Sequence, residues 1–428
     1  MAKKSNSPSG YEESDNTLLG NYRVLDLTDD NEYSCGKLMA FLGAEVIKIE
    51  APGGDPGRDI GPFFEGNPDR EKSISWWASN VNKKSATLDI QTREGQKTFL
   101  ELAQTADFVI ESFAPGYLDE LGLGYSELSK INPAIVVTSI TPFGQTGPYA
   151  HYHASDLVLM AMGGPMSQTG EPDGLPLRWY QGQSYQIAGA YAASNSLIAH
   201  HYRVLSGRGQ HIDVSIQECV TTMPLVWAGE WELARHVTPR SDNRPWRAGM
   251  PGPSIRHLWL CRDGFVTFVL HGGRLREKEN QALAEWISED GISDRLRHVD
   301  WETFEISPST QAEMLIWEPL IERLFLRYTR NELEEGGVRR GIQLVAVRSV
   351  KEVVEGEHFA ERRFWAKIDH PELSTSFKYP GRLFSCTHTE NGVRFRAPLI
   401  GEHNLEVYCA ELGISTEELS RLRKLKVI

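Results

Sequence analysis

The sequence predicts an α/β protein with a mostly parallel, doubly wound sheet and a second, smaller domain. Short apolar segments alternate with segments of helical periodicity through the first half of the chain. This alternation is typical of parallel strands joined by helices. The residue pattern changes near residue 225, where tryptophans lie among turn residues such as RPWRAGMPGPS. A length of 428 residues, 40% of them hydrophobic, is enough for two cores.

The elements of the sheet follow in chain order. We expect strands at 22–27, 45–50, 86–90, 108–111, 135–140 and 211–216. We expect helices between them at 37–42, 94–105, 125–130 and 186–206. Gly207 follows the longest helix and can adopt the left-handed conformation that ends it.

The remaining segments predict the smaller domain and the two ends of the chain. The smaller domain is assigned to 225–345, with a strand at 264–270 and helices at 281–286, 311–326 and 332–335. The segment 401–428 predicts two amphipathic helices with a Ser415–Glu418 capping box between them. Residues 1–18 are polar and predict a flexible tail without the apolar segment of a signal peptide.

Charge and cysteine content restrict the class of protein. The net charge is -13, from 45 basic and 58 acidic residues, which argues against binding to nucleic acid or to an anionic membrane. No run of about 18 apolar residues is present to span a bilayer. The cysteines are odd in number and form no CxxC pair, so we expect a reduced, cytoplasmic protein without a metal site. They lie at 35, 219, 261, 386 and 409.

Six stretches of the chain carry a family resemblance. They are LGAEVIKIEAPGGDPGR (42–58), NVNKKSATLDI (80–90), ADFVIESFAPGYLDELGLGY (106–125), INPAIVVTSITPFGQTGPYA (131–150), GRGQHIDVSIQE (207–218) and GEHNLEVYCAELGIS (401–415). In this order they span almost the whole chain and resemble the class III CoA-transferases, also called the CaiB/BaiF family. The resemblance implies a Rossmann-like large domain formed by both chain ends, 19–224 and 346–428. It also implies an interlocked dimer.

The resemblance also implies acyl transfer through an aspartate. In the family, this carboxylate attacks the donor thioester and becomes a mixed anhydride, which CoA thiolate converts to an aspartyl-CoA thioester before the acceptor acid attacks. The aspartate stands four residues before a glycine that matches Gly189, so Tyr185 occupies its position. A phenol with a pKa of about 10 is a poor nucleophile at neutral pH. We therefore expect no catalytic residue in this chain.

Asp156 is the best remaining acid near this position, and it has two interpretations. It could replace the nucleophile, but an isolated acid at a helix start more often serves as a cap. His151 and His153 could act as bases, although solvated loop positions are the more ordinary interpretation. The family's racemase branch pairs its aspartate with a histidine where this chain has Ser155, so α-proton exchange has no obvious agent here.

The positions that resemble a CoA site have lost positive charge. The family can place Lys or Arg at the positions held here by Ala51, Gln91, Glu120 and Thr141. The loop at 29–32 reads Asp-Asp-Asn-Glu, and its carboxylates repel a nucleotide phosphate. The resemblance places a degenerate CoA site at Asn31, Leu88, Phe113 and Phe143.

Three functions remain open from the sequence. The first is a catalytically silent subunit that pairs with a paralogous, aspartate-bearing chain as a heterodimer or a dimer of heterodimers. Coenzyme A thioester is then a substrate of the complex, and no cofactor is expected. The second is a stand-alone CoA-ester isomerase, lyase or hydrolase that uses Asp156 or a water. The third is a binding or regulatory protein.

Overall fold

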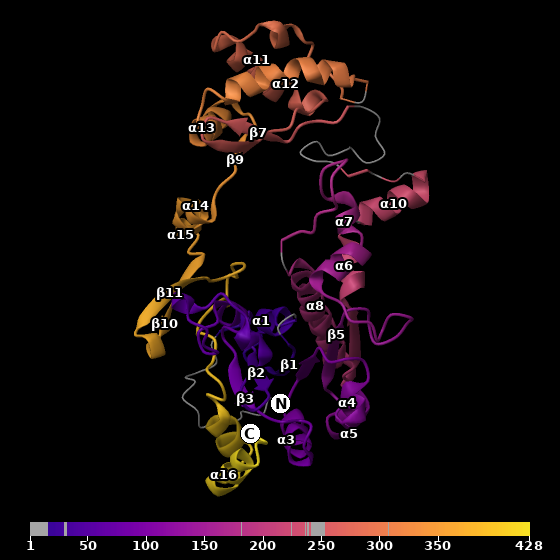
Figure 1. Cartoon of the computed structure of the whole chain (residues 1–428), viewed down its shortest axis with the longest axis vertical. Helices are drawn as coiled ribbons and strands as arrows, with labels where there is room; N and C mark the ends of the chain where they lie inside the picture. The colour runs from indigo at the N-terminus through magenta and orange to yellow at the C-terminus, as the bar shows by residue number, and fades with distance from the viewer. Residues whose placement is uncertain are drawn as a thin grey trace. The chain divides into compact units, whose positions relative to one another are not determined.

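A computed structural model of the chain describes residues 16–428, except 30–31, 181, 224, 236, 238, 241–252 and 307. The chain divides into two compact units (Figure 1). The first contains Met1–Gly163, Tyr180–Thr222 and Glu357–Ile428. The second contains Gly164–Trp179 and Met223–Gly356.

A six-stranded parallel sheet forms the centre of the first unit. Its strands are β1 (Arg23–Leu27), β2 (Glu45–Glu50), β3 (Lys84–Thr87), β4 (Phe108–Glu111), β5 (Val136–Thr141) and β6 (His211–Ser215). Their order in space is β3-β2-β1-β4-β5-β6, with every neighbouring pair parallel. This is the strand order of a doubly wound Rossmann sheet. The predicted α/β fold class is confirmed.

Helices and a hairpin complete the first unit. The helices are α1 (Ser34–Phe41), α2 (Ile74–Ser79), α3 (Arg93–Ala103), α4 (Tyr117–Glu120), α5 (Tyr125–Ile131), α6 (Asp156–Met162), α8 (Gln183–Ser206), α9 (Ile216–Thr222), α15 (Glu357–Glu361) and α16 (Thr416–Lys424). The hairpin pairs β10 (Trp365–His370) with β11 (Thr375–Pro380). A π-helix covers Leu405–Glu411. Helix α8 ends at Gly207, whose φ of 71° confirms the predicted left-handed cap.

The two faces of the sheet are covered by different helices. Leu25 and Val137 pack in one core with Phe99 of α3, Leu128 of α5 and Leu419 of α16. On the other face, the Thr138 hydroxyl of β5 lies 2.8 Å from the Ser196 hydroxyl of α8, and α1 packs against α8. Because successive side chains of a strand point to opposite faces, the odd and even positions of β5 serve two different layers.

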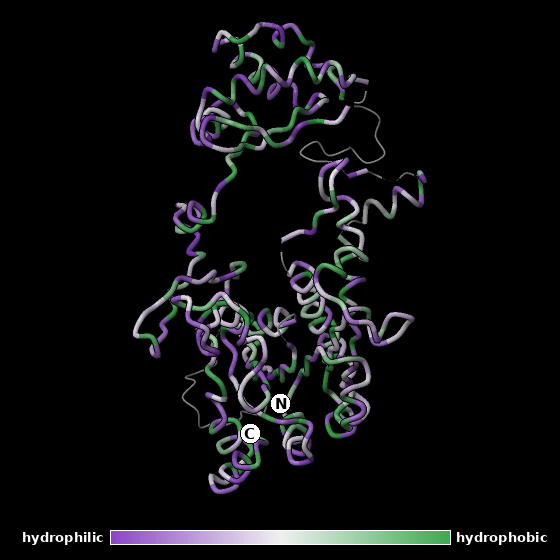
Figure 2. Tube along the Cα trace, in the orientation of Figure 1, coloured by the Kyte–Doolittle hydropathy of each residue, from purple (hydrophilic) through white to green (hydrophobic). Residues whose placement is uncertain are grey.

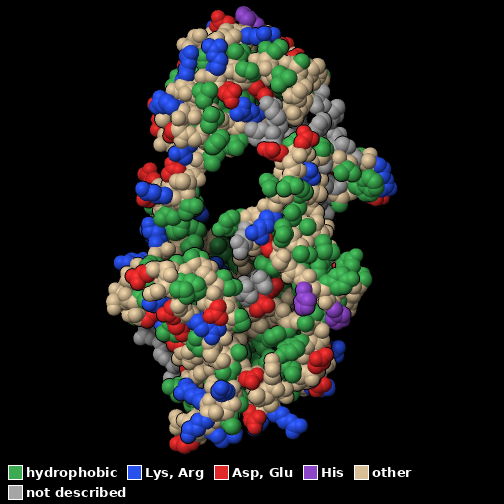
Figure 3. Space-filling model, viewed as in Figure 1, with side chains coloured by type: hydrophobic (Ala, Val, Ile, Leu, Met, Phe, Trp, Pro, Cys, Tyr) green, Lys and Arg blue, Asp and Glu red, His purple; other side chains and the backbone are tan. Residues whose placement is uncertain are grey.

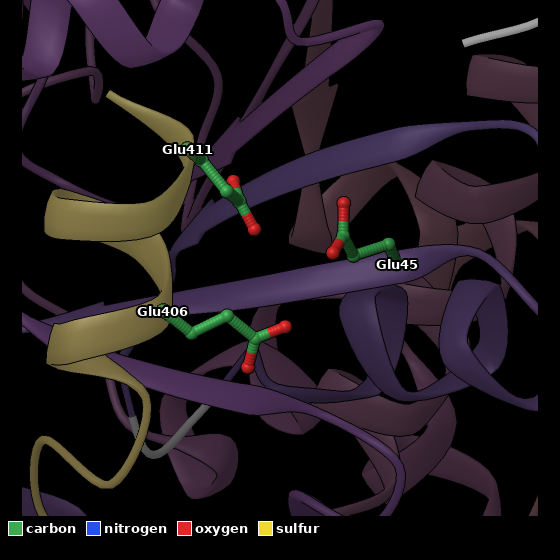
Figure 4. A group of neighbouring side chains, drawn as sticks. All are labelled: Glu45, Glu406 and Glu411. Atoms are coloured by element: carbon green, nitrogen blue, oxygen red, sulfur yellow. The ribbon is translucent and has the colours of Figure 1, made fainter. Parts of the chain in front are cut away.

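The C-terminal segment is bound to the N-terminal strands. The side chains of Glu406 and Glu411 point toward Glu45 of β2 (Figure 4). Arg23 bonds to Glu45 and Glu411 at 2.7 and 2.6 Å, and Lys84 bonds to Glu45 and Glu406 at 2.5 and 2.8 Å. Since each of these three carboxylates is paired with at least one of the two cations, the group is an ion-pair cluster that joins both ends of the chain.

The second unit has its own core of aromatic and aliphatic side chains. Its elements are α7 (Pro165–Gln168), α10 (Leu225–Ala234), β7 (Leu258–Cys261), β8 (Gly264–Thr267), α11 (Glu277–Glu289), α12 (Gln311–Phe325), α13 (Arg330–Arg340), β9 (Val345–Ala346) and α14 (Val350–Glu355). Trp259, Trp286, Trp301 and Trp317 are buried in this core. Figure 2 shows hydrophilic and hydrophobic residues alternating along its helices, as expected for helices that bury one face.

Several predicted boundaries are wrong, each for a local reason. The third strand was expected at 86–90 but ends at Thr87, because the Asp89 N–H donates to the Val427 carbonyl at 2.7 Å instead of to the sheet. The expected capping box at Ser415 is only half formed. Ser415 accepts from the Glu418 N–H at 3.2 Å, whereas the Glu418 carboxylate bonds to Arg421.

The division into units also differs from the predicted ranges. The tail predicted at 1–18 ends earlier, because the Asn16 carbonyl accepts from the Glu390 N–H at 2.8 Å. The segment 164–179 belongs to the second unit, where Arg240 donates to the Gly174 carbonyl at 3.0 Å. The second unit also extends to Gly356 rather than 345.

Two smaller findings concern the cysteines and the helices. Cys219 and Cys261 are buried, as expected for core residues, whereas Cys386 is exposed. None of the helices in the described parts of the chain combines the length and hydropathy needed to cross a membrane.

Candidate functional site

The candidate site lies at the carboxyl ends of the parallel strands. Asp29 follows β1 and Ser112 follows β4, and these strands are neighbours in the sheet although β2 and β3 come between them in the chain. This is the point where the strand order reverses, and doubly wound sheets bind ligands at such a point. The Asp29 N–H donates to the Ser112 hydroxyl at 2.8 Å, which joins the two loops.

A pocket of about 370 Å³ opens at this edge. We call it the Tyr185 pocket, because Tyr185 from the first turn of α8 lines it. Its other described lining residues come from the loops after β1, β4 and β5. They are Asp29, Glu32, Ser112, Phe113, Ala114, Pro115, Pro142, Ala150, His151, Tyr152, His153 and Ala154. The pocket therefore lies where the resemblance places the family's nucleophile.

The first turn of α8 is held by Asp156. Gly182 precedes the helix and has no side chain with which to cap it. The Asp156 Oδ1 atom instead accepts from the Ser184 N–H at 3.1 Å and from the Ser184 hydroxyl at 2.7 Å. Asp156 is 5% exposed and is not among the residues that line the pocket. These bonds give it a positioning role for the turn that carries Tyr185.

The charges of the Tyr185 pocket do not suit a polyanionic ligand. Its described lining residues include the carboxylates Asp29 and Glu32 and no Lys or Arg. The positions where the family can place cations are neutral or acidic here: Ala51 and Glu120 are exposed, and Thr141 is fully buried. Nucleotide phosphates are normally bound by Lys, Arg or helix N-termini, so the described lining of this pocket lacks the usual side-chain partners.

An aromatic cluster lies beside the pocket, and the sequence reasoning missed it. The rings of Phe143, Tyr149 and Tyr152 are 5.2 to 6.4 Å apart. Tyr149 and Tyr152 are 43% and 58% exposed. Figure 3 shows histidine side chains beside a hydrophobic patch where Figure 1 places the loop after β5. The available signal was the aromatic and histidine run GPYAHYH.

The residues predicted for a degenerate CoA site lie in different surroundings. Phe113 lines the Tyr185 pocket and packs 4.8 Å from the Tyr117 ring. Phe143 is 8% exposed and reaches the pocket only through its contact with Tyr152. Leu88 is buried in the core with α3. Asn31 lies outside the described residues. Among the described residues of this group, Phe113 lines the pocket and the other two do not.

A larger pocket of about 420 Å³ lies between the β10–β11 hairpin and the segment 394–403. It is rich in basic residues, but three of its cations are already paired. The Lys83 ammonium lies 2.7 Å from the Asp26 carboxylate. Lys84 bonds to two glutamates, and Arg396 bonds to Glu402 at 2.7 Å and Glu372 at 3.0 Å. The pocket at the carboxyl ends of the strands is therefore the better candidate.

Comparisons with known proteins agree with this fold. The family model described as CoA-transferase family III matches residues 19–404. The chain is a member of CoA-transferase family III. The family predicted from the sequence motifs is therefore confirmed.

Two characterised relatives and one solved structure resemble this family member along most of its length. Succinyl-CoA:(R)-benzylsuccinate CoA-transferase subunit BbsE of Thauera aromatica is 32% identical over 95% of this chain and 97% of its own. Succinyl-CoA–D-citramalate CoA-transferase of Chloroflexus aurantiacus is 32% identical over 92% and 94%. A CaiB/BaiF family protein from Brucella suis superimposes with a TM-score of 0.78, at 25% identity over 95% and 99%.

Proposed function

We propose that this chain is the non-catalytic subunit of a heteromeric class III CoA-transferase. A paralogous chain supplies the aspartate that carries the acyl group. The observation that supports this most is Tyr185, a phenol at the family's nucleophile position, in a pocket whose described lining has no Lys or Arg. A phenol cannot form the mixed anhydride that the family's reaction requires.

The proposed reaction moves CoA from an acyl-CoA, such as succinyl-CoA, to a carboxylic acid, such as benzylsuccinate in anaerobic toluene degradation. The support is the similarity to BbsE, which is named as a subunit of an enzyme acting on these two compounds. A second relative is also named for succinyl-CoA. The identity of the acceptor acid has less support than that of the donor, because the name of this second relative gives D-citramalate in place of benzylsuccinate.

The decisive experiment co-expresses this chain with an aspartate-bearing paralogue and measures CoA transfer. We expect activity to require both chains, and substitution of the partner's aspartate to abolish it. Tyr185→Phe should leave most of the activity, because the phenol hydroxyl takes no part in the chemistry. Full turnover by this chain alone, or a large loss in Tyr185→Phe, would contradict the proposal.

Restoring the acid should not be sufficient. Tyr185→Asp returns a carboxylate but leaves Ala51, Glu120 and Thr141 where the family can place cations. Without a positioned thioester the variant forfeits the proximity advantage of an intramolecular reaction, about 7–11 kcal/mol of the barrier. We expect no transfer by the isolated variant and weak CoA binding to the isolated chain. Calorimetry that detects tight CoA binding would show that the site is competent.

The proposed assembly is the interlocked pair, with 19–224 and 346–428 forming one large domain. Obligate interfaces of this kind bury about 2,000–5,000 Å², so the chain alone should self-associate or aggregate. Co-expression should yield a stable mixed complex on size-exclusion chromatography. A well-folded monomer at micromolar concentration would contradict interlocking without affecting the proposed silent role.

A further inference from the structure

A serine hydroxyl on β5 connects a buried carboxyl on β4 to an exposed imidazole on β6. Glu111 ends β4, is 5% exposed and lies opposite Ser139 of β5 in the sheet register. The Ser139 hydroxyl is hydrogen-bonded to Glu111. The same hydroxyl oxygen lies 2.9 Å from the Nε2 atom of His211, an exposed residue that begins β6.

None of the described groups around Glu111 supplies a positive charge. Its register neighbour on β1 is Leu27. Asp119 of α4 and Asp213 of β6 are the nearby acids, and Tyr125 of α5 stacks on His211 at 6.0 Å. A pocket of about 230 Å³ lies between these elements, and its described lining residues contain no Lys or Arg. Glu111 therefore ionises without a cation to stabilise it.

Burial raises the pKa of Glu111 to about 7, even though hydrogen bonds from Ser139 and Phe113 favour the ionised form. The carboxylates of Asp119 and Asp213 add to the increase. Desolvation also lowers the pKa of His211, against the attraction of these two carboxylates. Glu111 thus changes its charge close to neutral pH, where an ordinary glutamate is fully ionised.

The charge of Glu111 acts on a wall of the Tyr185 pocket. The Phe113 N–H donates to the Glu111 Oε2 atom at 2.8 Å. Phe113 and Ser112 belong to the turn that lines the pocket, and the Ser112 hydroxyl holds the loop after β1. A hydrogen bond to a carboxylate is roughly twice as strong as one to a neutral acceptor, so ionised Glu111 binds the turn more tightly.

We propose that Glu111, Ser139 and His211 form a proton-linked latch that tightens the turn 112–115, and with it the wall of the Tyr185 pocket, when Glu111 loses its proton. In the ionising step the Glu111 proton passes to the Ser139 oxygen and the Ser139 hydroxyl proton passes to His211 Nε2. His211 releases its Nδ1 proton to water. Atoms and charge balance without any further reactant.

Hydrogen exchange on the full chain, in whichever assembly it purifies, tests the latch. Protection of the amides at 112–114 and 116, corrected for the intrinsic exchange rate, should rise as the pH is raised through neutrality. Glu111→Gln should remove this rise, because an amide cannot ionise. Glu120→Gln, which changes an exposed carboxyl on α4, is the matched control and should behave like the native chain. A native pH profile in Glu111→Gln would overturn the proposal.

A second variant tests the relay itself. Ser139→Ala removes a hydrogen bond that favours ionised Glu111, so the pH of the exchange transition should move upward. Infrared difference spectra between mildly acidic and mildly alkaline samples should show a protonated carboxyl band that Glu111→Gln lacks. An unchanged midpoint in Ser139→Ala would overturn the relay. Neither readout depends on a partner's activity, so these results are independent of the proposed subunit role.

Discussion

The buried acids on the two faces of the sheet have different partners. On the face shared with α1 and α8, the Asp26 carboxylate lies 2.7 Å from the Lys83 ammonium, and both side chains are fully buried. The neighbouring Glu50 carboxylate lies 2.6 Å from the Arg58 guanidinium, again with both side chains fully buried. On the face covered by α4 and α5, Glu111 meets a hydroxyl and an amide but no cation.

The difference shows that the neighbouring side chain, and not the depth of burial, decides whether the pKa of a buried acid is lowered or raised. Burial by itself raises the pKa of Asp26, but the ammonium groups of Lys83 and Lys48 outweigh it, and the pKa is lowered. Glu111 has a similar burial and a raised pKa. One face thus pairs its buried acids with cations, and the other holds an acid whose charge changes near neutral pH.

The strongest test of this comparison removes a cation from the paired face. Arg58→Met leaves Glu50 buried without its guanidinium and also removes a contact with the Trp76 ring at 3.9 Å. Breaking a buried ion pair in this way costs about 3–5 kcal/mol. Chemical denaturation should show this loss in the free energy of unfolding, and a loss below about 1 kcal/mol would contradict the role of the pair.

The second test uses the sign of the pH dependence. The Asp26 pKa is lowered on folding, so its contribution to stability is present above the unfolded pKa and is lost on acidification. The Glu111 pKa is raised to about 7, so its contribution is present in mild acid and is lost as the pH rises through 7. Glu111→Gln should therefore be more stable than the native chain above neutral pH, by up to about 3 kcal/mol. If the denaturation midpoints of Glu111→Gln and the native chain differed by the same amount in mild acid and above neutral pH, this assignment would be contradicted.

A smaller effect is expected at the start of α8. Asp156→Ala leaves the Ser184 N–H without its acceptor, and loss of a helix N-terminal acceptor typically costs about 0.5–2 kcal/mol. Asp156→Asn keeps an acceptor oxygen and should recover most of this loss. If Asp156 were a nucleophile, Asp156→Asn would instead abolish turnover while leaving the stability nearly unchanged.

The smallest effect is expected for an exposed ion pair on the surface of α5. Lys130 and Glu127 of α5 form an i,i+3 pair at 2.5 Å, with side chains that are 65% and 45% exposed. Lys130→Met should change the free energy of unfolding by about 0–0.5 kcal/mol, and added salt should reduce even this. A loss comparable to that of Arg58→Met would show that pairing alone, without burial, explains the first result.

Much of the fold follows from local sequence, because apolar periodicity and turn residues act over short distances. The β1, β2, β4, β5 and β6 segments and helix α8 were predicted to within a few residues. The β10–β11 hairpin was missed, since its segments WAKIDH and TSFKYP lack a regular apolar alternation. The end of β3 was misplaced because Leu88 is apolar and continues the strand pattern, although it packs in the core after the strand has ended.

The candidate site, like the fold, was predicted from the sequence only in part. The family motifs placed Tyr185 at the position that corresponds to the family's nucleophile, and Phe113, one of the residues predicted for a CoA site, lines the same pocket. The Phe143, Tyr149 and Tyr152 cluster was not expected, because exposed aromatic residues in a loop have no periodic signal. A capping role for Asp156 was one of its two interpretations from the sequence, but the helix that it serves, α8 instead of its own α6, depends on where α6 lies relative to α8.

The sequence by itself determined the family, the parallel sheet and the absence of an acid at position 185. These are properties of single residues and short motifs. The tertiary structure alone decided which acids are paired. Asp26 and Lys83, or Glu111, Ser139 and His211, become neighbours only through strand register and chain crossover. A pKa depends on burial and on such distant neighbours, so no local pattern could distinguish Asp26 from Glu111.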